Sequence, residues 1–371
     1  MKYNILFDFS SIVSGGGAQL AINFMDMLAL HLNEIDMNPV VLCPAVGPIR
    51  DNWNNHLNIP AYHNPSQYAP RIRFERNQLP KIYSSHQIER IYTFFGPGLP
   101  HPKEIISYVG VAYPIICNPD SQYWKYLATR SCVRQKVINK FRVNRLKKYA
   151  NHIIAETPIM AERLKKYCGL KNVHIVSPAP SEYLKYSERS TDSPPHDVNR
   201  IGLLSGIDQH KNLWRLPAIA YEMLRDGTTD FEFVISISEK VGEKLLEGYP
   251  QVRDYFNFVG NISPKKIESF YTNIDTMMNI SDLESYSNNY MEAWTMKKPI
   301  IASDRDFSHG ILSGSGYYVD PHAIGDTAKK IIHFISEKSI HAEMIQAGAE
   351  KLAQLPTQEE RFKQVLGKIC D

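Results

Sequence analysis

The stretch Lys2-Tyr-Asn-Ile-Leu-Phe-Asp-Phe9 is an apolar run typical of a buried strand. Ser14-Gly-Gly-Gly17 follows it, and apolar periodicity from Ala18 to about Leu32 then predicts a helix. Further strand-like runs follow in the first half, separated by helical patterns such as Tyr123–Tyr149. Strands separated by helices favour a parallel sheet with crossover helices. The predicted fold class is therefore α/β.

The chain has 371 residues, more than the roughly 250–300 that one compact core usually holds, so we expect two domains. Ser187 to Asn199 is polar, contains two prolines and lacks periodicity, which is typical of a linker. The alternation of strands and helices restarts at Arg200. We predict a first domain over 1–186, a linker over 187–199 and a second domain over 200–356. A terminal helix at about 357–371 could cross back to the first domain.

Composition excludes several classes of protein. The hydrophobic fraction is 43%, and no apolar run approaches the roughly 20 residues that span a bilayer. The first residues form a poor signal peptide, because Asp8 interrupts a short apolar run. The expected location is cytoplasmic. The five scattered cysteines form no Cys-x-x-Cys pair and predict free thiols rather than disulfides or a zinc site.

Charge is distributed unevenly along the chain. Residues 1–180 hold 21 Lys and Arg against 11 Asp and Glu, whereas the remainder is acidic. The excess is concentrated between Arg130 and Lys148, a segment without one acid. A helix of this kind could lie on the inner membrane surface, making the protein peripheral. A solvated helix face, or phosphate attraction at the site, explains the charge equally well. Nucleic acid is not an expected partner, because no recognised binding motif accompanies the charge.

Two local patterns could bind a nucleotide. Gly16 and Gly17 open a helix directly after a strand, and free N–H groups at a helix N-terminus favour anions. Glu284 follows the predicted strand Thr276–Asn279, and Glu292 lies eight residues further on, inside the next predicted helix. That helix would aim its N-terminus at a phosphate, and Glu292 could accept hydrogen bonds from a ribose diol.

One lysine and one pair of aspartates are candidates for charge neutralisation and for metal binding. Lys211 follows the first strand of the second domain, at the start of a helix predicted over Lys211–Leu224, and is well placed to neutralise a departing diphosphate. The pair Asp304 and Asp306 could hold a divalent metal, but the intervening Arg305 opposes a cation. A solvated loop is the better interpretation of this pair, so no metal site and no essential metal or other cofactor are predicted.

The second half resembles the retaining glycosyltransferases of family 4. Their pattern is a Glu, seven residues and a second Glu on a strand–loop–helix, followed by a strand ending in Asp. Here it reads Glu284-Ser-Tyr-Ser-Asn-Asn-Tyr-Met-Glu292, then Pro299-Ile-Ile-Ala-Ser-Asp304. Phe258 to Ser263, Ser205 to Asn212 and Tyr318 to Pro321 also resemble family motifs. The resemblance covers most of the chain and is specific from about residue 200 to 321.

The resemblance implies a GT-B architecture, in which two Rossmann-like domains face a donor cleft. It implies transfer of a hexose or deoxyhexose from a nucleotide-sugar donor, with retention, to a saccharide or lipid-diphosphate-linked acceptor, as in surface polysaccharide synthesis. Glu284 and Lys211 would be catalytic. The implied donor-binding residues are Glu292, Gly16, Gly17, Asn261, Ile262, Ser287, Asn288 and Asn289.

This sequence departs from the family pattern in two places. Gly206 stands where the family has an arginine, so one charge partner of the diphosphate is missing. The first half also lacks the usual histidine, and Asn118 or Asp120 is the candidate for its place on the acceptor side. A sugar-nucleotide epimerase of the same fold and a non-catalytic nucleotide-sugar-binding subunit are therefore alternatives, since fold alone does not fix function.

Overall fold

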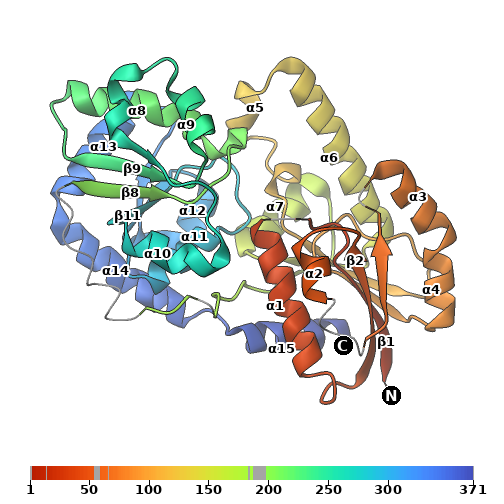
Figure 1. The fold of residues 1–371 in the computed structure, drawn as a ribbon. Helices are drawn as coiled ribbons and strands as arrows, with labels where there is room; N and C mark the ends of the chain where they lie inside the picture. Colours follow the sequence, from red (N-terminus) through yellow and green to blue (C-terminus); the bar gives the residue numbers. More distant parts are fainter. Residues whose placement is uncertain are drawn as a thin grey trace. The chain divides into compact units, whose positions relative to one another are not determined.

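The computed structural model describes residues 2–13, 15–53, 59–65, 67–182, 184–186 and 198–370. The chain forms two compact units (Figure 1). Unit 1 comprises Met1–Pro119, Leu127–Ala179 and Pro356–Asp371, and unit 2 comprises Asp120–Tyr126 and Pro180–Leu355. Each unit is a parallel sheet with interleaved helices, which confirms the predicted α/β class.

The sheet of unit 1 has seven strands within the described residues, in the order β3-β2-β1-β4-β5-β6-β7. All neighbouring strands in it pair in parallel. The strands are β1 (Tyr3–Asp8), β2 (Met37–Pro44), β3 (Ala61–Asn64), β4 (Arg90–Thr93), β5 (Ile106–Val111), β6 (His152–Ala155) and β7 (Val173–Ile175). The strand β3 was not predicted from the sequence.

The helices of unit 1 are α1 (Gly16–Leu30), α2 (Pro48–Trp53), α3 (Tyr68–Asn77), α4 (Leu79–Ser85), α6 (Thr129–Tyr149), α7 (Pro158–Cys168) and α15 (Gln358–Cys370). The prediction of one helix over Tyr123–Tyr149 was wrong. Ala128 has φ −54° and ψ 139°, which is outside the α conformation, so the segment divides into a short helix α5 (Tyr123–Tyr126) and α6.

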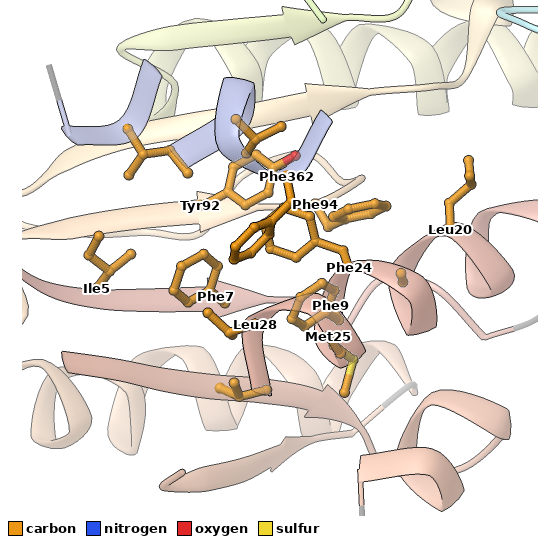
Figure 2. Close-up of a cluster of buried hydrophobic side chains, with 14 of the residues drawn as sticks. Ile5, Phe7, Phe9, Leu20, Phe24, Met25, Leu28, Tyr92, Phe94 and Phe362 are labelled. Atoms are coloured by element: carbon orange, nitrogen blue, oxygen red, sulfur yellow. The ribbon is translucent and has the colours of Figure 1, made fainter. Parts of the chain in front are cut away.

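The largest core cluster of unit 1 is rich in aromatic side chains, and the C-terminal helix completes it (Figure 2). Phe24 of α1 packs with its ring centroid 5.1 Å from that of Phe362 of α15 and 5.4 Å from that of Phe94. Burying a side chain of this size contributes about 1.5–3 kcal/mol. The last residues of the chain therefore stabilise the sheet that the first residues begin.

Unit 2 has a six-stranded sheet within the described residues, in the order β10-β9-β8-β11-β12-β13, again all parallel. Its strands are β8 (Asn199–Leu203), β9 (Phe231–Ile235), β10 (Phe256–Phe258), β11 (Thr276–Asn279), β12 (Ile300–Ser303) and β13 (Gly316–Val319). Unit 2 contains α5, and its other helices are α8 (Leu216–Arg225), α9 (Glu239–Leu246), α10 (Ile267–Thr272), α11 (Asn288–Thr295), α12 (Asp306–Leu312), α13 (Ile324–Ser336) and α14 (Lys338–Ala353).

The unit boundaries differ in detail from the predicted domains. Residues 187–197 of the predicted linker lie outside the described residues, and Asn199 already belongs to β8. The segment Asp120–Tyr126 falls in the predicted first domain but belongs to unit 2 by its contacts. Among the described residues, no helix combines the length and the apolar character needed to cross a bilayer.

Candidate active site

The sheet of unit 2 has a topological switch point between β8 and β11. The chain adds β9 and β10 on one side of β8, and then adds β11, β12 and β13 on the other. Loops leaving the carboxyl ends of β8 and β11 therefore diverge, and open parallel sheets bind ligands at such a point. Lys211 lies in the first of these loops and Glu284 in the second.

Lys211 and Glu284 form an ion pair, with Lys211 Nζ 2.6 Å from Glu284 Oε1. The prediction that Lys211 starts a helix was wrong, because it ends a 3-10 turn over Gln209–Lys211, and α8 begins only at Leu216. Asn212 adopts a left-handed conformation, with φ 57°, so the 3-10 turn ends there and does not continue into α8. Its side-chain amide donates to the carbonyl oxygen of Ile280 at 2.9 Å, which fastens the two loops together.

The Glu284 carboxylate stays ionised in this setting. Burial alone would raise its pKa, but the charge of Lys211 and the hydrogen bond from it outweigh burial, and the pKa is lowered. The structure therefore holds one positive and one negative group side by side at the switch point. Such a pair can neutralise a leaving anion and at the same time present a carboxylate to a sugar.

Helix α11 begins at the same edge of the sheet. Asn279, at the end of β11, donates to the Ser287 hydroxyl oxygen at 2.8 Å, and Ser287 is the residue before the helix. Asn289 donates from its side chain to the carbonyl oxygen of Leu204, after β8, at 2.9 Å. These bonds fix the N-terminus of α11, where the first backbone N–H groups lack helical partners and favour an anion. Asn288 is the first residue of the helix.

Glu292 lies one turn into α11, against buried Tyr271. The Tyr271 hydroxyl donates to Glu292 Oε2 at 3.0 Å, and no other partner of this carboxylate is found in the described part of the chain. Burial raises the pKa of Glu292 to about 7 against the opposing effect of the Tyr271 hydrogen bond. The carboxylate is therefore costly to ionise unless further donors reach it.

A network that the sequence analysis did not identify supports the Glu284 loop. Asp282 is buried, and its carboxylate lies 2.9 Å from His322 Nε2 and 3.1 Å from Arg305 Nη2. Burial would raise the pKa of Asp282, but hydrogen bonds from His322 and Asn212, with the charges of His322 and Arg305, lower it. The Asp282 N–H donates to the His210 carbonyl oxygen at 2.7 Å. Asp282 thus joins both loops of the switch point.

The segment Asp120–Tyr126 packs on this network within unit 2. The Ser121 hydroxyl donates to the Asp282 carbonyl oxygen at 3.1 Å. The Tyr126 ring stacks on His322, with centroids 4.5 Å apart, and Arg215 lies over the same ring at 4.5 Å. Arg215 also hydrogen-bonds His322. The sequence gives no local signal for this arrangement, because its members are far apart in the chain and have no shared motif.

The remaining predicted site residues are divided between the two units. Asn261 and Ile262 follow β10 at the same edge of the sheet of unit 2. In unit 1, Gly16 is the first residue of α1 and Gly17 the second, at the carboxyl end of β1. Asn118 is buried in unit 1 and donates to the Pro114 carbonyl oxygen at 2.7 Å, while Asp120 is exposed and belongs to unit 2. The proposed roles of all these residues stay predictions.

The acids of the Asp304–Asp306 pair have protein partners. Asp304 Oδ1 lies 2.7 Å from His309 Nε2, and Asp306 accepts from the Phe307 N–H at 2.8 Å. Arg305, between them, forms ion pairs with Asp282 and Asp320. Across the residues that the structure describes, no three His, Cys, Asp or Glu side chains gather as a metal site would require.

We expect Asp282→Asn to lower the free energy of unfolding by about 2 kcal/mol, because the substitution removes the charge that accepts from His322 and Arg305. Because folding lowers the pKa of Asp282, its charge stabilises the native protein above about pH 4, and this stabilisation disappears in more acidic solution. The difference between Asp282→Asn and the native protein should therefore shrink at low pH. Urea unfolding at pH 7 and pH 3 measures both effects. Asp326→Asn is the matched control, because Asp326 forms an exposed pair with Lys330 and should cost under about 0.5 kcal/mol. Equal losses in the two variants would contradict a structural role for Asp282.

Comparison with known proteins bears on the family and on the fold. Residues 229–351 match the family model "Glycosyl transferases group 1". No curated protein matches the chain in sequence. Sucrose-phosphate synthase from Thermosynechococcus elongatus has a similar structure, with a TM-score of 0.74 and 13% identity, over 99% of this chain and 98% of that one.

Two further structures are similar over nearly the whole chain. HepE from Anabaena, in complex with UDP and glucose, has a TM-score of 0.70 and 14% identity, over 99% of each chain. WaaG, a glycosyltransferase involved in lipopolysaccharide biosynthesis, has a TM-score of 0.70 and 12% identity, over 98% of this chain and 99% of that one. The chain therefore has the GT-B fold throughout, and its residues 229–351 match the group 1 glycosyltransferase model.

Proposed function

We propose that the protein is a retaining glycosyltransferase that moves a hexose or deoxyhexose from a nucleotide-sugar donor to a saccharide or lipid-linked saccharide. The observation that carries the proposal is the Lys211–Glu284 pair at the switch point of unit 2. The α11 N-terminus lies at the same edge, and Glu292 lies one turn further along. The family match and the fold support a nucleotide-sugar glycosyltransferase. The similarity to WaaG supports a role in surface polysaccharide synthesis.

Each group has a distinct part in the proposed reaction. Lys211 and the N–H groups at Ser287, Asn288 and Asn289 hold the diphosphate, whose charge grows as the sugar leaves. Glu292 accepts hydrogen bonds from the ribose, and Asn261 and Ile262 flank the base. Glu284 lies against the donor sugar. Because Lys211 and the helix N-terminus supply positive charge to the diphosphate, no essential metal is proposed.

Thermal unfolding with a panel of nucleoside diphosphates tests the donor half of the proposal. A ligand present at 100 times its Kd stabilises the folded state by about 2.7 kcal/mol. One diphosphate should raise the melting temperature of the native protein and leave that of Glu292→Ala unchanged. Lys329→Ala, at an exposed site on α13, is the control and should respond as the native protein does. No response to any nucleotide would refute the proposal.

A separate assay measures transfer of the sugar to an acceptor. With the nucleotide sugar identified above and a panel of saccharide acceptors, the product should keep the anomeric configuration of the donor, as read by proton NMR. An isomerised sugar nucleotide formed without acceptor would assign the site to an epimerase instead. Donor binding without turnover on any acceptor would indicate a binding subunit.

A further inference from the structure

Helix α6 has an inner face that packs in unit 1. Leu146 is fully buried, and the Asn139 side chain donates to the Ile115 carbonyl oxygen at 2.9 Å. Arg145 forms an ion pair with buried Glu75 of α3 at 3.0 Å. These contacts fix how the helix is rotated, and Figure 1 shows α6 along the outside of unit 1. The opposite face therefore points to solvent.

That outer face has an apolar stripe. Val133, Val137 and Phe141 are 58%, 63% and 47% exposed. They recur every fourth residue, and at roughly 100° per residue this spacing places them in one row along the helix. The row lies on the side opposite Asn139 and Leu146. Three neighbouring apolar side chains on one exposed helix face differ from singly scattered ones, which need no explanation.

Cations surround the stripe. The exposed basic side chains of α6 are Arg130, Arg134, Lys136, Lys140, Lys147 and Lys148. No residue from Thr129 to Tyr149 is acidic, so the helix carries no compensating charge of its own. Lys and Arg next to an apolar row can extend their charged ends toward a polar boundary while their stems cover apolar surface.

We propose that α6 docks on an anionic lipid bilayer, with Val133, Val137 and Phe141 in the boundary between headgroups and acyl chains. The cations alone would fit any polyanion. The apolar row distinguishes a bilayer, because a nucleic acid backbone offers nothing to bury Val137 and Phe141 against. The inference rests on unit 1 alone and does not depend on the proposed transfer reaction.

Sedimentation of the full chain with lipid vesicles tests the proposal. Vesicles of phosphatidylcholine and phosphatidylglycerol in equal parts should bind the protein, less so at high salt, and pure phosphatidylcholine vesicles should not. Lys136→Gln/Lys140→Gln should weaken binding roughly fivefold for each cation removed. Val137→Ser/Phe141→Ser should weaken it by at least tenfold. All four side chains are exposed, and circular dichroism checks that the variants are folded.

Matched controls come from other exposed positions of unit 1. Leu30, at the end of α1, is 68% exposed, and Lys165 and Lys171 are exposed as well. Leu30→Ser and Lys165→Gln/Lys171→Gln should bind vesicles as the native protein does. Native binding to pure phosphatidylcholine, or unchanged binding of Val137→Ser/Phe141→Ser, would overturn the proposal. Absence of binding to the anionic vesicles would overturn it as well, and binding to a duplex DNA fragment would then assign the cations to nucleic acid.

Discussion

Lys211→Ala is expected to lower kcat/KM for sugar transfer about 10²–10³-fold, the usual effect of removing one electrostatic contact to a group that gains charge in the transition state. The ammonium group lies 2.6 Å from Glu284, in the loop that leaves β8 at the switch point. Gly206, in the same loop, stands where the family that this sequence resembles has an arginine, so we expect no second cation from that position. The loss should appear mainly in kcat.

The same substitution has a cost in stability, which must be separated from the cost in catalysis. Without Lys211, burial dominates at Glu284 and raises the pKa of that carboxyl, because the charge of Lys211 is the strongest influence that lowers it. We expect Lys211→Ala to lower the free energy of unfolding by about 2 kcal/mol. The double variant Lys211→Met/Glu284→Gln removes both charges and should recover most of that stability but none of the activity.

Lys329→Ala is the control for loss of a surface lysine and should change neither quantity. Urea unfolding and steady-state transfer on the same preparations measure both effects. Full activity in Lys211→Ala, with its stability reduced as expected, would show that the ion pair is structural only.

The fold was largely predictable because its signal is local. The apolar run Thr276–Asn279, for example, is a strand with the bounds that the sequence predicts. The misses are elements whose signal is weak or non-local. The strand β3 has only four residues, and its burial is mixed, so no apolar run marks it. The interruption before α6 depends on the backbone conformation of Ala128, which no residue preference specifies.

The candidate site was predictable only in part, for the same reason. Lys211 and Glu284 were identified separately, and the topology of the sheet brings them together. Asp282, by contrast, was not identified, although it lies two residues from Glu284. Its partners His322 and Arg305 come from the loops after β13 and β12, so only the strand order reveals the network. Tyr126 is less predictable still, because it belongs to unit 2 through contacts alone.

Glu292 gives the second large effect, and its direction depends on pH. Glu292→Gln should raise the free energy of unfolding of the nucleotide-free protein at pH 8 and change it little at pH 4.5. The reason is that the pKa rises from 4.5 in the unfolded chain to about 7 in the folded one. Ionising the folded carboxyl therefore costs stability progressively between these pH values, reaching roughly 3 kcal/mol above pH 7. Glu343→Gln, at an exposed site on α14, should show no such gain.

Nucleotide binding should favour the ionised form of Glu292, whereas folding without nucleotide favours the protonated form. A ribose diol can donate to the Glu292 carboxylate but gains less from the protonated acid, so the proposed site binds the ionised form. Below pH 7, the affinity for the nucleoside diphosphate should fall with a slope approaching about tenfold per pH unit, and binding at pH 7 should release about half a proton from Glu292. Calorimetry in buffers of different ionisation enthalpy measures the number of protons released on binding.

The Glu292→Gln variant should bind the nucleotide weakly and keep only the pH dependence of the phosphate itself. A native affinity that is level between pH 5.5 and pH 8 would place the ribose elsewhere, and the stability gain of Glu292→Gln would then be the only effect of this carboxylate.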